Sequence, residues 1–287
     1  MQAGLIGLGS MGVWMARNLA QAGFLTAVYN RTPAKAAALA KELQVLSYDS
    51  PEALAAKVDV VFICVSADQD VIEVVNALAK TIKPESIVVD MSTVSSATAL
   101  LATARLAERQ AAFLDAPVSG GVEGAKKGTL SMMVGGDAKT LRKVYPLLES
   151  MATRIIHMGA VGTGQGTKAV NQIMAAGINQ AVTEALAFAA AQQLPLAKVI
   201  DVIAGGAAGN WFLEHRGRSM TQGSFKPGFK LALHQKDLKN CQAMAKQNGT
   251  SLPLVEATVA DYAQLITDGF GHEDISALYR LKTKRKA

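Results

Sequence analysis

Three polar side chains near the start of an apolar segment have the types and the spacing to do chemistry. Lys168, Asn171 and Gln172 follow the glycine-rich run 162–166 and stand three and four residues apart, so a helix brings them to one face. A lysine is costly to bury without a purpose, and an ammonium in a cleft can serve as general acid and base. We interpret Lys168 as a candidate proton donor, with Asn171 or Gln172 holding lysine and substrate in place. A structural polar cluster between helices is the alternative.

The segment Gly7-Leu8-Gly9-Ser10-Met11-Gly12 has a pattern that binds a dinucleotide. It follows a short apolar run and precedes a helical pattern that begins near Trp14. In this order of strand, turn and helix, Gly7 permits the tight turn, Gly9 lets the backbone approach a pyrophosphate, and Gly12 lets the helix pack close to the strand. The N–H groups at the helix start face the phosphates. A plain glycine turn is the alternative, but the context on both sides favours the cofactor.

The end of the next expected strand carries Asn30, Arg31 and Thr32. In the NAD-binding version of this fold, an acidic residue here receives the ribose 2′-hydroxyl. Asn30 removes the charge that would repel a 2′-phosphate, and Arg31 can pair with that phosphate in bidentate fashion. The segment therefore predicts NADP(H) rather than NAD(H). The alternative is a solvated arginine before a helix that Thr32 caps.

Further strand ends should face the same crevice, because ligands bind at the carboxyl ends of strands in open α/β sheets. One apolar strand ends at Val65 and Ser66, and another ends at Ser92 and Thr93. Ser92 or Thr93 is expected to bond ribose or nicotinamide, or else both serve only to cap the following helix. At Ser119-Gly120-Gly121, a hydroxyl and unobstructed backbone N–H groups offer a cradle for a carboxylate, with an ordinary glycine turn as the alternative.

The first half of the chain has the pattern of a scaffold that could position these residues. Up to about residue 160, β-rich runs alternate with helical patterns, which predicts βαβ units and a parallel sheet covered on both faces. The expected strands are Gln2–Gly7, Leu25–Tyr29, Val58–Val65, Ser86–Met91, Ala112–Asp115, Ser131–Val134 and Arg154–His157. The expected helices between them are Ala34–Leu43, Gln69–Ala79, Ser96–Gln110 and Lys139–Met151.

The second half predicts helices alone. A long apolar helical pattern from Thr167 to about Gln193 ends at Leu194-Pro195. Further helices are expected at Leu196–Ile203, Trp211–Met220, Leu231–Asn248, Pro253–Asp268 and His272–Lys284. We therefore expect an α/β fold class, with a doubly wound Rossmann domain over residues 1–161 followed by an all-α domain over residues 162–287.

Composition narrows the class of protein. Of 287 residues, 50% are hydrophobic and 18% charged, which is typical of a packed intracellular enzyme. Two cysteines indicate neither a disulfide framework nor a metal site, no apolar run reaches the length that spans a bilayer, and the chain enters a strand at once, without room for a signal peptide. These features predict a cytoplasmic protein without membrane contact.

The charge balance indicates the kind of partner. The net charge of +6 suits an anionic cofactor and an anionic substrate. Part of it lies in the tail Arg280, Lys282, Lys284, Arg285 and Lys286, which lacks the interleaved aromatic residues of a nucleic-acid binder and is expected to be a solvated end. The sequence therefore predicts no nucleic-acid partner.

Together, these segments resemble the β-hydroxyacid dehydrogenase family over essentially the whole chain. Its four signatures occur in order, at Gly4–Gly12, Asp115–Gly121, Gly162–Gln172 and Lys236-Asp237-Leu238. The resemblance implies that Lys168 protonates the alkoxide that forms as hydride passes from nicotinamide to the substrate carbonyl carbon.

The resemblance also implies roles for the other motifs. Ser119, Gly120 and Gly121 would hold the substrate carboxylate, Lys236 would close over the nicotinamide, and Phe229 would line the substrate site. The family commonly has asparagine four residues after the lysine, where this chain has Gln172, so the orienting amide is Asn171 or Gln172. The substrate would lie between the two domains, and the helical half would pair subunits into a homodimer or homotetramer.

The expected function is NADP(H)-dependent interconversion of a small semialdehyde or 2-oxo acid and its hydroxy acid. An NAD-dependent 3-hydroxyisobutyrate dehydrogenase is the nearest alternative. A catalytically inactive dehydrogenase-like module is a further alternative, but it predicts loss of the lysine or of the Ser-Gly-Gly cradle, and both are present.

Overall fold

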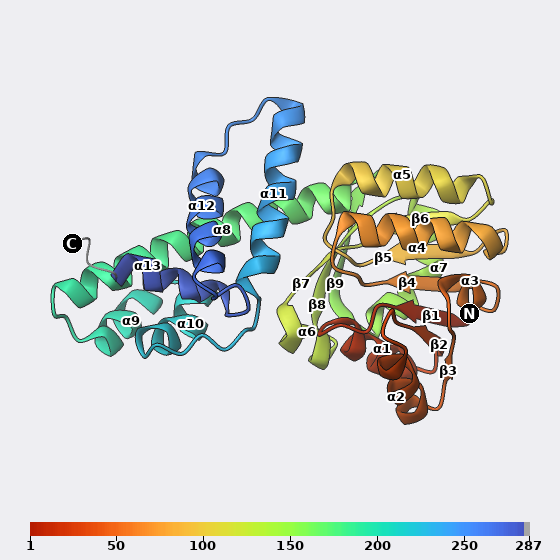
Figure 1. The fold of residues 1–287 in the computed structure, drawn as a ribbon, viewed down its shortest axis with the longest axis horizontal. Helices are drawn as coiled ribbons and strands as arrows, with labels where there is room; N and C mark the ends of the chain where they lie inside the picture. The colour runs from red at the N-terminus through yellow and green to blue at the C-terminus, as the bar shows by residue number, and fades with distance from the viewer. Residues whose placement is uncertain (284–287) are drawn as a thin grey trace. The chain divides into compact units, whose positions relative to one another are not determined.

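The computed structural model describes residues 1–283 of the chain and divides into two compact units, Met1–Lys168 and Ala169–Ala287 (Figure 1). Lys284, Arg285 and Lys286 of the basic tail, and the last residue of the predicted helix His272–Lys284, lie outside the described residues. Within them, Arg280 is paired with Glu273, and Lys282 with Glu184 and Asp261.

The first unit is a Rossmann-like α/β unit built on one sheet. Its strands are β1 Ala3–Ile6, β2 Leu25–Tyr29, β3 Leu46–Ser47, β4 Val60–Ile63, β5 Ile87–Asp90, β6 Ala112–Asp115, β7 Val118–Ser119, β8 Leu130–Gly135 and β9 Ala152–Gly159. Its helices are α1 Gly12–Gln21, α2 Pro33–Leu43, α3 Pro51–Ala55, α4 Asp68–Thr81, α5 Ser96–Ala107, α6 Gly121–Lys127 and α7 Ala138–Glu149. Helix α8, Thr163–Ala191, begins in this unit and continues into the second.

The sheet order is β3-β2-β1-β4-β5-β6-β8-β7, with β9 paired to β8. The strands from β3 to β6 are parallel, as the sequence predicts, and the order reverses between β1 and β4. Strand β8 is antiparallel to both β6 and β7, so the sheet is mixed at this edge, and the predicted parallel arrangement does not extend to it. The connection from β7 to β8 holds only the short helix α6, and the chain turns back beside the strand it has just left.

Two layers of helices cover the sheet, and alternation along each strand divides the core between them. Leu5 packs with apolar residues of α1, α2, α6 and α7, whereas its neighbour Ile6 packs with residues of α3, α4 and α5. Figure 1 shows α4 and α5 side by side over one face. A strand buried on both faces explains the nearly continuous apolar runs that predict this sheet.

The elements that the sequence does not predict are short. Strands β3 and β7 have two residues each, and α3 and α6 have five and seven. Ser50 caps α3 by accepting a hydrogen bond from the Ala53 amide, and Gly120 and Gly121, with φ of 127° and 62°, turn the chain into α6. Local turn and cap chemistry, rather than a hydrophobic period, forms these elements.

The second unit is all helical in its described part, as predicted. It contains the rest of α8, then α9 Leu196–Ala204, α10 Trp211–Thr221, α11 Leu231–Asn248, α12 Pro253–Thr267, the 3₁₀ turn η1 Ile275–Leu278 and α13 Tyr279–Thr283. The predicted final helix is therefore a 3₁₀ turn followed by one short helix. Its hydrophobic core contains residues from every one of these elements, and Tyr262 within it is fully buried.

Helix α8 is long and apolar enough to cross a bilayer by length and average composition, although polar residues such as Lys168, Asn171 and Gln180 interrupt its apolar sequence. The buried polar side chains of its middle part, however, are bonded inside the second unit. Asn179 donates to the Tyr262 hydroxyl and the Ile275 carbonyl, and Gln180 donates to Thr258. These bonds are those of a helix packed in a protein core.

Candidate active site

The glycine-rich turn after β1 contains two glycines that have no room for a side chain and one that faces open space. Gly7 has φ of 97°, and a Cβ there would lie 2.2 Å from the Cys64 carbonyl oxygen. A Cβ on Gly12 would lie 1.9 Å from the Gly7 carbonyl oxygen, whereas a Cβ on Gly9 would meet nothing within 4 Å. Gly7 and Gly12 therefore hold the turn against β4 and α1, and Gly9 leaves its outer side open.

The turn delivers the chain to the N-terminus of α1 at the point where the strand order reverses. No side chain caps this helix, and its first turn carries no acidic residue. An uncapped helix start at a topological switch point is the place where α/β folds bind phosphate groups.

Asn30, at the end of β2, holds this turn in place. Its Oδ1 accepts a hydrogen bond of 2.9 Å from the Leu8 amide, and its Nδ2 donates to the Thr32 carbonyl. Thr32 occupies the N-cap position of α2, but its side chain makes no capping hydrogen bond. The capping role that the sequence offers as an alternative for Thr32 is therefore not seen.

Arg31 is the cation at this edge. Its side chain is 84% exposed and forms a salt bridge of 3.0 Å with Asp70 of α4. The guanidinium thus lies at the surface beyond β2, where an anionic ligand would compete with Asp70 for it.

The ends of β4 and β5 are tied together by Ser92. Its Oγ accepts a hydrogen bond of 2.9 Å from the Val65 amide, and its own amide donates to Asp90 Oδ1 at 3.0 Å. Ser92 is buried, and the residue that caps α5 is Ser95. Ser92 is therefore a structural link, while the half-buried Thr93 and the exposed Ser66 remain as candidate ligand contacts at these strand ends.

Two buried carboxyls stand in register on adjacent strands, Asp90 on β5 and Asp115 on β6. Burial raises the pKa of Asp90 to about 7, and its Oδ2 has no hydrogen-bond partner. Burial also raises the pKa of Asp115, although the amides of Gly162 and Gln165 oppose this shift. The hydrogen-bond donors to these two carboxyl groups include backbone N–H groups, which favour the ionised form against the effect of burial.

Asp115 fixes the start of α8. Its Oδ1 accepts a hydrogen bond from the Gly162 amide and its Oδ2 one from the Gln165 amide, each at 2.8 Å. A Cβ on Gly164 would lie 2.3 Å from the Met133 carbonyl oxygen, so only glycine lets the helix start approach β8 this closely. The carboxylate meets the positive end of a long helix, which stabilises both.

Lys168 lies in the second turn of α8 and is the last residue of the first unit. It is 7% exposed, which is unusual for a lysine. The sequence-predicted Ser119 ends β7 and is half-buried, and Gly120 and Gly121 follow it in exposed positions that open α6. The first unit thus contains the glycine turn, the strand ends, the Ser-Gly-Gly segment and Lys168.

The second unit holds a chain of polar contacts between α8 and α11. Asn171 Nδ2 donates to Gln172 Oε1 at 2.7 Å, and Gln172 Nε2 donates to Asp237 Oδ2 at 2.6 Å. Lys236 Nζ pairs with the other oxygen of Asp237 at 2.7 Å. Gln172 is almost fully buried with both ends of its amide engaged, whereas Asn171 is half-buried.

Phe229 is half-buried, and Asp274 fixes the backbone that carries it. Asp274 Oδ2 accepts hydrogen bonds from the amides of Gly228 and Phe229. The Phe229 ring lies 5.3 Å from the His234 ring, and His234 contacts the Gln172 carbonyl at 3.2 Å. Phe229 therefore belongs to the same part of the second unit as Asn171 and Gln172.

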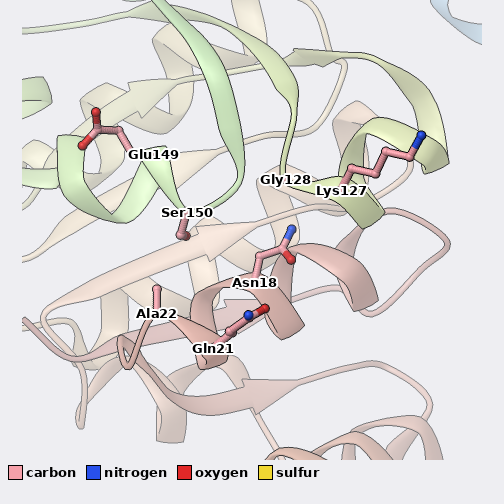
Figure 2. Close-up of a pocket in the computed structure, with 7 residues that line it drawn as sticks. All are labelled: Asn18, Gln21, Ala22, Lys127, Gly128, Glu149 and Ser150. Atoms are coloured by element: carbon pink, nitrogen blue, oxygen red, sulfur yellow. The ribbon is translucent and has the colours of Figure 1, made fainter.

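A hollow in the surface of the first unit lies away from these residues. Figure 2 shows this polar hollow, lined by Asn18, Gln21, Lys127, Glu149 and Ser150, at the opposite end of α1 from the glycine turn. Within residues 1–283, no group of three His, Cys, Asp or Glu side chains is placed to hold a metal ion.

Sequence reasoning missed Asp90, Asp115, Gln165, Asp237 and Asp274 as organising residues. Asp90 and Asp115 each end a strand, a position that is visible in the sequence and marks the ligand-facing edge of the sheet. Gln165 and Asp237 lie within signatures of the family resemblance, but their structural roles are not visible in the local pattern, because their partners lie far away in the chain. The same holds for Asp274.

Comparison with known proteins covers both units. The NAD-binding domain of 6-phosphogluconate dehydrogenase matches residues 2–159 as a family model, and the model for NAD-binding of NADP-dependent 3-hydroxyisobutyrate dehydrogenase matches residues 162–282. The chain is 37% identical over 281 residues to 2-hydroxy-3-oxopropionate reductase of Escherichia coli, covering 97% of this chain and 96% of that one.

Other relatives are similar along their whole length. NAD-dependent L-serine dehydrogenase of Pseudomonas aeruginosa is 32% identical over 290 residues, with 98% of this chain and 97% of that one covered. The structure of Mycobacterium tuberculosis 3-hydroxyisobutyrate dehydrogenase with L-serine superposes with a TM-score of 0.89 at 33% identity, over 98% of this chain and 99% of that one.

Proposed function

The chain belongs to the β-hydroxyacid dehydrogenase family, and from that premise we propose that it interconverts a small semialdehyde or 2-oxo acid and its hydroxy acid with NADP(H). Its membership makes it an oxidoreductase with a nicotinamide cofactor. The phosphorylated cofactor, the substrate class and the residue roles are the content of the proposal.

The observation that carries the proposal is the position of Lys168. Its helix starts against Asp115 at the end of β6, and the same turn is bonded to the loop Ser92–Val94 at the end of β5. A buried ammonium fixed beside strand ends that suit a dinucleotide is what proton transfer next to hydride transfer needs.

NADP(H), when bound, supplies or takes up the hydride at the substrate carbon. As the carbonyl is reduced, the Lys168 ammonium gives a proton to the substrate oxygen; in oxidation the neutral amine takes that proton from the hydroxyl. Ser119 and the backbone amides of Gly120 and Gly121 would hold the substrate carboxylate.

Residues of the second unit would complete the site. We assign the orienting role to Asn171, because Gln172 is engaged at both ends of its amide by Asn171 and Asp237. Lys236, anchored by Asp237, would close over the nicotinamide, and Phe229 would line the substrate side.

The glycine turn and its neighbours support NADP(H). The uncapped start of α1 and the open side of Gly9 suit the pyrophosphate, and Val65, Ser66 and Thr93 suit the nicotinamide half. Asn30 places a neutral amide where a carboxylate would repel a 2′-phosphate, and Arg31 lies next to it on an exposed side chain.

An NAD-dependent hydroxy-acid dehydrogenase, such as a 3-hydroxyisobutyrate dehydrogenase, is the rival candidate. The salt bridge of Arg31 with Asp70 favours it, since the guanidinium then has a partner without a 2′-phosphate. The L-serine dehydrogenase relative is described as NAD-dependent. An inactive dehydrogenase-like module is not favoured, because Lys168 and Ser119 are retained.

The test is initial-rate kinetics of the purified protein with glyoxylate, succinic semialdehyde, tartronate semialdehyde and methylmalonate semialdehyde, each with NADPH and with NADH. We expect turnover of at least one substrate, with kcat/KM for NADPH above that for NADH by about tenfold or more. A preference for NADH would overturn the cofactor assignment. No oxidation of either cofactor with the whole panel would overturn the substrate class.

Assembly and location are parts of the same proposal. We propose a homodimer or homotetramer formed through the helical unit, which sedimentation measurements would test. We also propose a cytoplasmic enzyme that does not bind nucleic acid or membranes. Neither statement bears on the chemistry at Lys168.

A further inference from the structure

Gln165 is a buried amide that none of the proposed catalytic or binding roles uses. It lies in the first turn of α8 and is 1% exposed. Its Nε2 donates to the Ser92 carbonyl at 2.9 Å, and its Oε1 accepts from the Val94 amide at 3.1 Å. The single side chain thus bonds the backbone on both sides of Thr93.

The backbone of Gln165 is fixed as well. Its amide donates to Asp115 Oδ2 at 2.8 Å. The residue is therefore held from two neighbouring strand ends, by its side chain to the loop after β5 and by its main chain to the end of β6. Such a residue has little freedom to move without breaking buried hydrogen bonds, each of which is costly to leave unmade.

The contacts of Gln165 lead in two directions. Ser92, whose carbonyl Gln165 bonds, also accepts from the Val65 amide through its Oγ, so a hydrogen bond links the loops after β4 and β5. On its own helix, Gln165 stands one turn before Lys168, at the spacing of three residues that places two side chains on one helix face.

We propose that Gln165 is a positioning residue that sets the place of Lys168 relative to the loop carrying Thr93. The inference rests on the proposed function, in which Lys168 transfers the proton and the loops after β4 and β5 hold the nicotinamide half of the cofactor. Gln165 touches neither reacting group and acts through the two backbone contacts and the helix.

An amide is the side chain that this position requires. One end must accept from an N–H group and the other must donate to a carbonyl oxygen. A glutamate would set a carboxylate oxygen against the Ser92 carbonyl, and a methionine of similar length would make neither bond. Methionine leaves both backbone groups without this partner, whereas glutamate leaves only the Ser92 carbonyl without its donor, and either change lets the helix start shift.

Gln165→Met and Gln165→Glu test the proposal, with Gln264→Met as the matched control. Gln264 is an exposed helical residue whose amide bonds only Asp268 among the described contacts. Three quantities are measured for each protein: the Kd for NADPH by fluorescence, kcat/KM for the best substrate of the panel, and the kinetic isotope effect with NADPH dideuterated at C4. Amide hydrogen exchange at residues 92–95 and the thermal midpoint complete the set.

We expect Gln165→Met to lower kcat/KM by about 100-fold, since a misplacement of about 1 Å costs that much, while the Kd for NADPH changes by less than about fivefold. The isotope effect should rise because chemistry becomes slower than product release, and exchange at Val94 should accelerate. Gln165→Glu should change the rate and the isotope effect in the same direction without faster exchange at Val94, because its carboxylate still accepts from that amide, and Gln264→Met should match the wild type.

Two results would overturn the inference. One is an active wild type whose Gln165 variants keep kcat/KM within about threefold. The other is a loss of rate that follows the loss of folded protein, with an unchanged isotope effect, which is the signature of a structural role alone. If a variant does not fold, the remaining Gln165 variant decides by the same criteria. An inactive wild type contradicts the proposed function instead, and unchanged exchange at Val94 in Gln165→Met would then reject the positioning contact independently of turnover.

Discussion

Asn30 accepts a hydrogen bond of 2.9 Å from the amide of Leu8, so the residue at the end of β2 holds the turn after β1. The same side chain therefore shapes the glycine turn and sets the charge beside the expected 2′-phosphate. An aspartate has the same shape and keeps the acceptor oxygen for Leu8, but it adds a negative charge and loses the N–H donor that Asn30 offers to the Thr32 carbonyl.

Asn30→Asp should thus change cofactor choice while the hydrogen bond from the Leu8 amide is kept. We expect KM for NADPH to rise about tenfold or more through repulsion of the 2′-phosphate, and KM for NADH to stay level or fall. Steady-state kinetics with both cofactors measures this. Equal effects on the two cofactors would show that the variant damages the turn and not the charge.

Arg31 gives a second, independent test of cofactor choice. Its exposed guanidinium must leave Asp70 to pair with a phosphate. Arg31→Met should raise KM for NADPH about fivefold to tenfold, and Asp70→Asn should lower it by about twofold, because the competing carboxylate is gone. The differences in KM for NADPH between these variants and the wild type should become smaller as the ionic strength rises, which measurements at low and high salt would show. An Asp70→Asn variant that binds NADPH more weakly would contradict competition between the two anions.

Substitution of the two neighbouring amide residues on α8, Asn171 and Gln172, should affect activity in one case and stability in the other. Asn171→Ala should lower kcat/KM about tenfold to 100-fold with a thermal midpoint near that of the wild type, because the half-buried Asn171 is assigned to the substrate. Gln172→Ala leaves the buried Asp237 without its amide donor and should cost about 2 kcal/mol of folding free energy. Kinetics and thermal melts of both variants measure the contrast. The reverse pattern would assign the orienting role to Gln172.

Asp90 makes stability depend on pH. Because burial raises its pKa to about 7 in the folded state, the folded protein binds more protons than the unfolded chain between about pH 4 and about pH 7. The stabilisation is complete below about pH 4 and is lost as the pH rises through about 7. An asparagine side chain at this position does not titrate. The free energy of unfolding of Asp90→Asn, relative to that of the wild type, should therefore be larger at pH 8 than at pH 5.

Urea unfolding of both proteins at pH 5 and at pH 8 measures this relative stability. We expect it to increase between the two pH values by on the order of 2 kcal/mol. Asp201→Asn, at an exposed position paired with Arg218, is the control and should show little difference between the two pH values. If the stability of Asp90→Asn relative to the wild type is the same at pH 5 and pH 8, then Asp90 of the folded protein is ionised at both, which would contradict its raised pKa.

The long elements of the fold are predictable from the sequence because a hydrophobic period marks them. Leu25–Tyr29 and Leu231–Asn248 have the predicted bounds, and the order of strands and helices follows from their alternation. The antiparallel β8 could not be predicted in this way. Its direction depends on how α6 returns the chain beside β7, and α6 forms from two glycines with positive φ rather than from a hydrophobic pattern.

In the candidate site, too, local motifs are predictable from the sequence, and contacts between distant residues are not. The spacing of Gly7, Gly9 and Gly12 suggests the turn from the sequence alone, because three glycines between a strand and a helix form a local pattern, even though the Cys64 carbonyl that Gly7 approaches lies far away in the chain. Gln165 bonds Ser92, 73 residues earlier in the chain, and Gln172 bonds Asp237, 65 residues later. Only tertiary packing brings such partners together, so their roles could not be predicted.

The most direct test of the account is Lys168→Ala, studied with NADPH and the best substrate of the panel. We predict that kcat falls by about 1,000-fold or more, that the Kd for NADPH stays within about threefold of the wild-type value, and that the fold is kept. A Lys168→Ala protein that binds NADPH and turns over within about tenfold of the wild type would contradict the assignment of Lys168 as the general acid and base.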